Sequence, residues 1–155
     1  MSNIKDLLTN FNIIDFDLKR PWGGFYVIDE SQAQQFADTF FDGLSIETLL
    51  IGGKLSPKIL LVSPNKRLSW QYHNRRAEIW RVISGPVAVV RSNTDEEGEM
   101  MVHQAGEYIK LNQGERHRLI GLDQQAIIAE IWQHIDLDHP SDELDIIRVQ
   151  DDFGR

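Results

Sequence analysis

The feature that most constrains the fold is a series of short apolar segments that fills most of the chain. Strands are expected near residues 44–51, 58–63, 67–73, 78–84, 87–92, 99–104, 107–111, 116–121 and 126–134. Gly, Pro, Asn or Asp stands in the turns between them, as in "SPNK", "SGP" and "NQGE". Many short strands at this spacing, with little helix between them, indicate an all-β sandwich or barrel.

The first part of the chain is less regular. Apolar residues from Ile4 to Phe11 recur at helical spacing, so residues 1–19 are expected to form a short amphipathic helix and a connector. The stretch "RPWGGFYVID" then predicts a turn into a strand, whereas residues 31–43 fit either a helix or an irregular insertion. Without a repeat or a linker, residues 1–155 are expected to form one domain, with the barrel and tail in residues 20–155.

Composition narrows the classes of protein and of site. The chain has no cysteine, which excludes disulfides and thiolate metal sites. Its net charge of −8 argues against a nucleic-acid partner. No apolar run is long enough to cross a bilayer, and the first residues lack the basic and apolar regions of a signal peptide. We therefore expect a cytoplasmic protein with neither a nucleic-acid nor a membrane partner.

Basic residues nevertheless gather in one part of this acidic chain. Between residues 65 and 81 a single acid, Glu78, stands among five cations: Lys66, Arg67, Arg75, Arg76 and Arg81. Two more, Arg116 and Arg118, occur in "GERHR". Solvated surface arginines would give this pattern, and so would a positive pocket for a small anion such as phosphate.

The same region carries a group of potential metal ligands. Side chains alternate between the two faces of a strand, so Gln71 and His73 share one face with Arg67 and Ser69. The other face carries Leu68, Trp70 and Tyr72, whose outward apolar side chains lead us to expect a homodimer.

Two further side chains complete the candidate ligand set. Glu78 follows a short bend that brings it back beside His73, and His117 begins a later strand. Two imidazoles, a carboxylate and an amide oxygen suit Zn²⁺, Mn²⁺, Fe²⁺ or Co²⁺.

The spacing of these residues resembles the two motifs of the cupin superfamily. The first is Gln71-x-His73-x4-Glu78-x6-Gly85, and the second is Gly106-x5-Asn112-x-Gly114-x2-His117. Gln71 stands where the general motif has its first His, and Asn112 replaces the usual Pro. The resemblance implies a double-stranded β-helix, or jelly-roll barrel, preceded here by a short N-terminal helix. Gly85 and Gly114 would permit the tight turns.

Within the cupins, the chain resembles type II mannose-6-phosphate isomerases. The resemblance rests on "RPWG", on "LSWQYHNRRAEIWRVISG", on "ERHRL" and on the ending "DELDIIRVQDDFGR". It implies a metal-dependent conversion of mannose 6-phosphate to fructose 6-phosphate through an enediolate. A glycine-rich nucleotide loop is absent, so the guanylyltransferase activity of fused family members is not expected.

The resemblance also implies roles for single residues. Gln71, His73, Glu78 and His117 would hold a divalent metal ion, with Zn²⁺ the expected one. Glu130 would be the general base and Lys110 the second candidate, and Arg118 is counted with these catalytic residues although parity turns it away from His117. The substrate phosphate would be bound by arginines, with Arg67 and Arg76 added from the local charge cluster: Arg20, Arg67, Arg76, Arg148 and Arg155.

Three alternatives stay open from the sequence. The substrate would be another sugar phosphate, such as a heptose phosphate, if the divergent segment 31–57 alters the site as a lid or a dimer contact. A non-catalytic sugar-binding cupin would keep the same scaffold. A cupin dioxygenase would use Fe²⁺ held by two His and a carboxylate, but the arginine cluster favours the isomerase.

Overall fold

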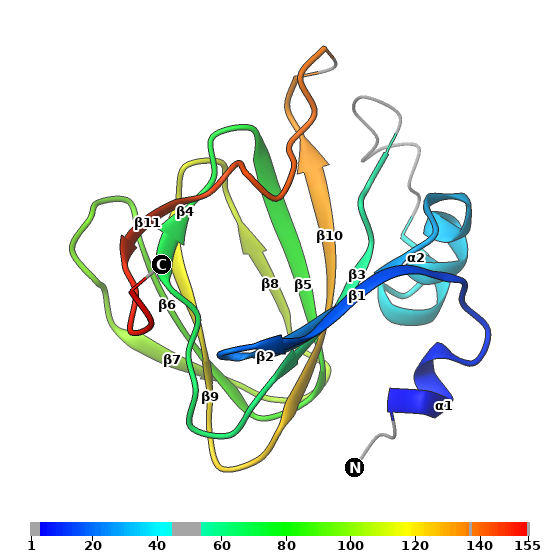
Figure 1. Ribbon diagram of the computed structural model, residues 1–155, viewed down its shortest axis with the longest axis horizontal. Coiled ribbons are helices and arrows are strands. Elements are labelled where there is room, and N and C mark those ends of the chain that lie inside the picture. Colours follow the sequence, from blue (N-terminus) through cyan, green and yellow to red (C-terminus); the bar gives the residue numbers. More distant parts are fainter. Residues whose placement is uncertain (1–3, 45–53, 137, 155) are drawn as a thin grey trace.

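Two antiparallel sheets face one another and form a barrel (Figure 1). The computed structural model describes residues 4–44, 54–136 and 138–154. The six-stranded sheet has the order β1 (Ile13–Arg20), β2 (Gly23–Ile28), β3 (Lys58–Val62), β10 (Ala126–His134), β5 (Arg76–Ser84) and β8 (Tyr108–Leu111). The five-stranded sheet has the order β11 (Ile147–Gln150), β4 (Trp70–Tyr72), β9 (Arg116–Gly121), β6 (Val87–Ser92) and β7 (Met100–His103). The predicted all-β class is confirmed.

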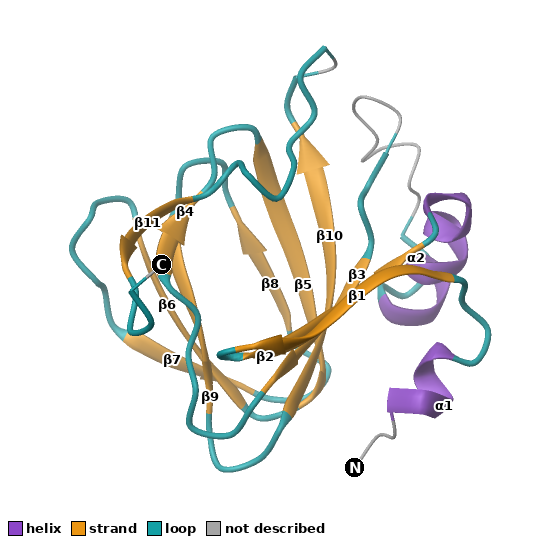
Figure 2. Cartoon of the chain, in the orientation of Figure 1, coloured by secondary structure: helices purple, strands orange, loops and turns teal. Residues whose placement is uncertain are grey.

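Helices occur only before β3 in the described part of the chain (Figure 2). They are α1 (Ile4–Leu8), a 3₁₀ turn, η1 (Glu30–Gln32), and α2 (Ala33–Phe40). The predicted N-terminal helix is confirmed by α1, and the ambiguous segment 31–43 is helical. None of the described helices is long and apolar enough to span a membrane.

The core is built in two layers because the central strands are buried on both faces. Leu60 and Val62 of β3 and Ile128 of β10 belong to the cluster inside the barrel. Their neighbours Ile59, Leu61, Ile127 and Ala129 belong to a second cluster on the outer face, which α2 covers with Phe36 and Phe40. This explains the uninterrupted apolar runs "KILLV" and "AIIAEIW", which are typical of strands buried on both sides. It also places α2 on the outside of the barrel, away from its interior.

Several predictions about single elements need correction. Residues 13–19 were expected to belong to the helix and connector of residues 1–19, but together with Arg20 they form the edge strand β1. In the tail, the unexpected strand β11 pairs with β4. Leu44 is not in a strand, and the rest of the strand expected at 44–51 lies outside the described residues. Of the strand expected at 67–73, only Trp70–Tyr72 pairs as β4.

The expected outward apolar face of β4 is covered by the chain itself. Trp70 is 2% exposed, and its indole nitrogen donates to the carbonyl of Asp95 in the β6–β7 loop at 2.8 Å. Leu68 packs against the barrel core, and the Tyr72 ring lies 3.8 Å from the Arg116 guanidinium carbon. These three residues therefore no longer support the homodimer, which stays a prediction.

Candidate active site

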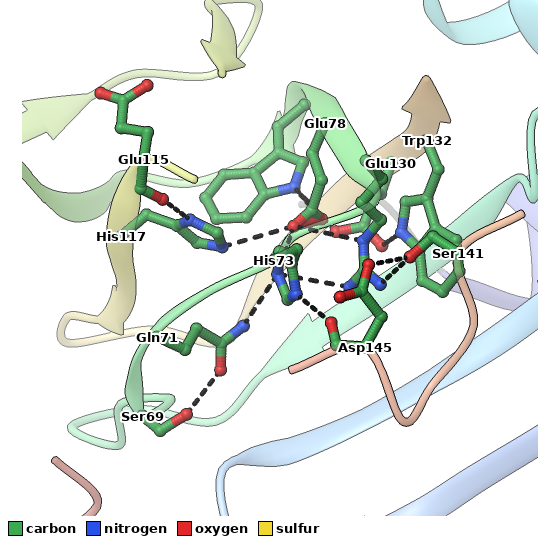
Figure 3. Close-up of polar contacts among 12 residues, drawn as sticks. Ser69, Gln71, His73, Glu78, Glu115, His117, Glu130, Trp132, Ser141 and Asp145 are labelled. Carbon is green, nitrogen blue, oxygen red and sulfur yellow. Dashed lines mark hydrogen bonds and ion pairs between the residues drawn. The ribbon is translucent and has the colours of Figure 1, made fainter. Parts of the chain in front are cut away.

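Strands of both sheets, β5 from one and the paired β4 and β9 from the other, bring the predicted metal ligands together inside the barrel. Glu78 lies on the inward face of β5, between Arg76 and Trp80, and all three are buried. His117 is the second residue of β9 and lies directly opposite Gln71 of β4. His73 follows β4 by one residue. The side chains of His73, Glu78 and His117 converge, with Gln71 beside His73 (Figure 3).

The three buried ligand candidates are within coordination range of one point. Their donor atoms all lie within 4.8 Å of one another. Glu78 Oε1 is 2.8 Å from His73 Nε2 and 3.3 Å from His117 Nε2. The Gln71 amide nitrogen is 3.5 Å from His73 Nε2, and its oxygen accepts from Ser69 Oγ. A rotation of that amide would turn the oxygen toward the cluster.

The ring nitrogens that face away from the cluster are both held by backbone carbonyls. His73 Nδ1 donates to the Asp145 carbonyl at 2.7 Å, and His117 Nδ1 donates to the Glu115 carbonyl at 3.0 Å. Each Nε2 therefore carries no proton, and its lone pair points toward Glu78. This arrangement is typical of metal-binding histidines. In the described part of the chain, Glu78 Oε1 and His117 Nε2 are buried without a hydrogen-bond partner. A divalent cation would satisfy both atoms, so the donor set fits a metal.

The surroundings of the cluster favour the protonation states that bind a metal, a neutral His73 and an ionised Glu78. Burial lowers the pKa of His73, which keeps its imidazole neutral. Burial alone would raise the pKa of Glu78, but its neighbours, among them the positive charge of the Arg76 guanidinium, hold it well below its usual range. A neutral imidazole beside an ionised carboxylate is the state in which both groups bind a metal.

Glu130 lies on the same inner surface and is held by two indoles. Trp80 Nε1 donates to one carboxyl oxygen at 2.7 Å, and Trp132 Nε1 donates to the other at 2.8 Å. The side chain is 4% exposed. Burial, reinforced by the negative charge of Glu78, raises the pKa of Glu130 well above its usual value. The structure therefore brings the predicted base next to the predicted metal ligands.

A cavity of about 110 Å³ opens beside these residues. Its wall includes Gln71, Glu78 and Glu130, and several cations line it as well: Arg20, Lys58, Arg76 and Arg148. Arg20, Arg76 and Arg148 were predicted phosphate ligands. Arg76 is 6% exposed, and its guanidinium carbon lies 3.6 Å from the Trp132 ring centroid.

Three predicted residues lie elsewhere. Arg67 forms a bidentate ion pair with Asp152 at 2.6 and 2.8 Å and does not line the cavity. Arg118 is buried on the opposite face of β9 from His117 and bonds Leu68, Glu97 and Gln150. Lys110 is exposed on β8, whose neighbouring residues Ile109 and Leu111 face the core. Strand parity accounts for Arg118 and Lys110, and Arg155 lies outside the described residues.

The segment after β10 closes over His73 and Arg76, which the sequence did not reveal. The Asp145 carboxylate accepts from the backbone nitrogens of Asn74 and Arg75, both at 2.9 Å, and from Ser141 Oγ at 2.6 Å. Arg76 donates to Ser141 Oγ at 2.9 Å. Asp145 thus fixes the bend before β5 and, through its carbonyl, the orientation of His73 (Figure 3).

His134 anchors the same segment, and its titration predicts a pH-dependent stability. Ser141 N donates to His134 Nδ1 at 2.9 Å, and Nε2 lies 3.1 Å from Ser56 Oγ. Burial, together with the charges of Lys54 and Arg76, lowers the pKa of His134 to about 4. Because the unfolded side chain titrates at about 6.5, this stabilisation is complete above that pH and is lost as the pH falls toward 4.

The His134→Asn variant tests this contribution. It should flatten the dependence of the free energy of unfolding on pH between 7 and 4.5, by at most about 1.4 kcal/mol per pH unit. Urea denaturation at several pH values measures it. The exposed His139 offers a matched control, since His139→Asn should leave the slope unchanged. Parallel pH profiles for wild type and His134→Asn would contradict the assignment.

Comparison with known proteins places this site in a family. Residues 42–151 match the family described as Mannose-6-phosphate isomerase C-terminal. The xanthan biosynthesis protein XanB of Xanthomonas campestris is 30% identical over 139 residues, covering 88% of this chain and 23% of XanB. The alginate biosynthesis protein AlgA of Pseudomonas aeruginosa is 27% identical over 128 residues, covering 81% and 24%. The chain thus spans about a quarter of the length of these curated relatives.

Solved structures support the fold. The capsular polysaccharide assembling protein CapF of Staphylococcus aureus superimposes with a TM-score of 0.57 at 13% identity, covering 92% of this chain and 33% of CapF. Hazelnut vicilin gives 0.57 at 18% identity, covering 86% and 33%. The barrel is the predicted cupin fold. With its two motifs, its inward ligand set and the match over residues 42–151, the chain belongs to the Mannose-6-phosphate isomerase C-terminal family.

Proposed function

We propose that the chain is a metal-dependent aldose–ketose isomerase that converts mannose 6-phosphate to fructose 6-phosphate. The observation that carries the proposal is the content of one cavity. It combines the ligand set around Glu78, a buried carboxyl group at Glu130 and cations that suit a phosphate. Family membership supports the reaction class, and the relatives' roles in xanthan and alginate biosynthesis support a sugar substrate.

The ligand set would hold the cation, with Zn²⁺ the expected ion. His73, Glu78 and His117 would bind it, and Gln71 would join them after its amide rotates. The cation would supply positive charge to the oxygens at C1 and C2 of the open-chain sugar. Because Gln71 is neutral, the site would keep more positive charge than two carboxylates would leave, which favours an anionic enediolate.

Glu130 would transfer the proton. Its carboxylate would take the proton from C2 of the aldose and return it to C1. The proton of the C2 hydroxyl would pass to the oxygen at C1, so that C2 becomes the ketone and C1 becomes an alcohol. The indoles of Trp80 and Trp132 fix both carboxyl oxygens, so the base is held in one orientation. A carboxyl whose pKa is raised by burial is a stronger base than an ordinary one, which suits this role.

The arginines of the cavity would bind the phosphate. Arg148→Ala is expected to raise KM for a phosphorylated sugar about 10-fold, because a charge-assisted contact is lost, with the metal still bound. Arg67→Ala is the control, since Arg67 contacts the tail through Asp152 but lies outside the cavity, and the KM of this variant should not change. Steady-state kinetics measures both variants. An unchanged KM in Arg148→Ala would remove that residue from the site.

The proposal is tested by incubating the zinc-loaded protein with mannose 6-phosphate and measuring fructose 6-phosphate. An EDTA-treated sample is the control, and a heptose phosphate is the second substrate. Metal-dependent formation of fructose 6-phosphate would support the proposal. Turnover of the heptose phosphate but not of mannose 6-phosphate would show that the substrate is a heptose phosphate. Stoichiometric metal without turnover of either compound would leave a sugar-binding role.

Two expectations are independent of the chemistry. The homodimer and the cytoplasmic location stay predictions. Exposed apolar side chains on the edge strand β1, Ile14, Phe16 and Leu18, now offer a surface for a second copy. Sedimentation equilibrium of the full chain would establish the oligomeric state.

A further inference from the structure

A buried lysine that the proposed reaction does not use lies in the wall of the cavity. Lys58 is 5% exposed and shares the inner face of β3 with Leu60 and Val62. Its ammonium nitrogen lies 4.9 Å from the centroid of the Phe25 ring and 4.4 Å from that of Trp132. Lys58 is therefore a positive charge placed between two aromatic rings at a cavity, rather than a solvated surface lysine.

The counter-charge of Lys58 comes from a different part of the chain. Its ammonium group forms an ion pair with the carboxylate of Glu143, in the segment between β10 and β11. The Glu143 side chain is 57% exposed and also lines the cavity. Glu130 lies opposite Lys58 on β10, but both of its oxygens accept indole hydrogen bonds.

The two sides of this ion pair differ in how easily they exchange partners. A buried ammonium group requires a counter-charge, because an unpaired charge in the interior is costly. An exposed carboxylate gains little from the pair and is solvated readily when it leaves. Glu143 is thus a replaceable partner for a cation that always needs one.

The size of the cavity also favours Glu143 as a replaceable partner of Lys58. Its volume is about 110 Å³, whereas pockets that hold small organic ligands usually measure about 300 Å³ or more. Glu143 lines this cavity with Arg20 and Arg148, two predicted phosphate ligands. Displacement of its side chain would enlarge the space at the position where an anion meets three cations.

We propose that Lys58 is an anion-binding residue of the cavity and that Glu143 occupies its place until the phosphate of a substrate displaces it. This assignment rests on the proposed function, because it names the group that receives the phosphate in the same cavity. A phosphate monoester carries about −1.5 to −2 charges at pH 7 and three acceptor oxygens, whereas a carboxylate carries one charge and two oxygens. The exchange therefore favours the phosphate once it can also reach the neighbouring arginines.

Titration of the full chain with inorganic phosphate, followed by calorimetry, tests the exchange without requiring turnover. Glu143→Gln keeps the shape of the side chain and removes its charge, so phosphate should bind about 3- to 5-fold more tightly. Lys58→Met should weaken binding about 10-fold or more, and Lys58→Arg should preserve it. Lys58→Met combined with Glu143→Gln should resemble Lys58→Met alone, because the competing pair no longer exists.

Controls separate the pair from general charge effects. Glu96→Gln removes the same charge from an exposed position outside the cavity and should leave phosphate affinity unchanged. Titrations before and after chelation with EDTA should agree on the effect of Glu143→Gln, which excludes phosphate binding through a metal. Circular dichroism verifies that the Lys58 variants fold. Glu143→Gln changes an exposed side chain, so its result does not depend on the folding of the Lys58 variants.

Equal phosphate affinities for wild type and Glu143→Gln would overturn the proposal, as would wild-type affinity in folded Lys58→Met. The isomerase assay gives a separate answer. If the phosphate affinities are as expected but the chain does not isomerise the sugar, the proposed reaction is refuted and the anion site is supported. If the chain isomerises the sugar but all variants bind phosphate with the wild-type affinity, the reaction is supported and the role of Lys58 and Glu143 is refuted.

Discussion

Glu78→Gln is expected to lower the affinity for zinc by more than about 100-fold and to abolish isomerisation, while the chain still folds. Loss of a residue that only orients a metal ligand costs about 10–100-fold, so loss of the central carboxylate should exceed that range. Glu78 Oε1 faces both imidazoles, and no other described carboxylate does so. The amide is isosteric with the carboxylate, which keeps the packing against Trp80.

Metal content after dialysis, measured by mass spectrometry, gives the result for Glu78→Gln directly. His117→Ala should behave in the same way, because it removes one imidazole from the set. Glu96→Gln is the charge-matched control and should retain metal and activity, since Glu96 is exposed and outside the cavity. Wild-type metal content together with full turnover in Glu78→Gln would refute the proposed metal mechanism.

Glu130→Gln should separate proton transfer from metal binding. Removing a general base typically lowers the rate about 10²- to 10⁴-fold, and we expect kcat to fall within this range. Metal content should stay near the wild-type level, because Glu130 is not in the ligand set. The amide oxygen can still accept one indole hydrogen bond, but the amide NH₂ group would face the other indole N–H, so one of the two hydrogen bonds that hold the side chain is lost. A large loss of metal, or an unchanged kcat, would exclude Glu130 as the base.

The pH dependence of kcat offers a second test of the same residue. Glu130 accepts a proton only when it is ionised, and burial and the charge of Glu78 raise its pKa. The wild-type kcat should therefore fall as the pH decreases through the pKa that Glu130 has in the metal-loaded enzyme, because the carboxyl is then protonated. A kcat that is independent of pH on the acidic side would contradict this role.

Much of the site could be predicted from strand parity. Gln71 and His73 share the inward face because they are two residues apart, and the same rule sets Arg118 on the opposite face from His117. Arg67 was added to the phosphate ligands from a local cluster of charge, which does not reveal where each side chain points, and Lys110 was the second candidate for the base. The Lys110 side chain points outward from β8, between the core residues Ile109 and Leu111. The charge of Arg67 is neutralised by Asp152 in the tail.

The residues that the sequence did not reveal depend on longer-range contacts. Lys58 has the same parity as Leu60 and Val62, but the run "KILLV" has no polar face to show which side is inward, since both sides are buried. Glu143 and Asp145 reach the site only because β11 pairs with β4, and nothing local in the tail predicts that pairing. The alternation of apolar and charged residues from Ile14 to Lys19 was a usable signal for β1.

Anomalous diffraction at the zinc absorption edge, from crystals of the full chain grown with zinc, tests the central claim most directly. The structure predicts one strong peak inside the barrel, between His73, Glu78 and His117, with the Gln71 amide oxygen turned toward it. The same measurement on Glu78→Gln should lack this peak. A peak at another position, or none in the barrel when zinc is bound stoichiometrically, would contradict the assignment of these residues as the metal centre.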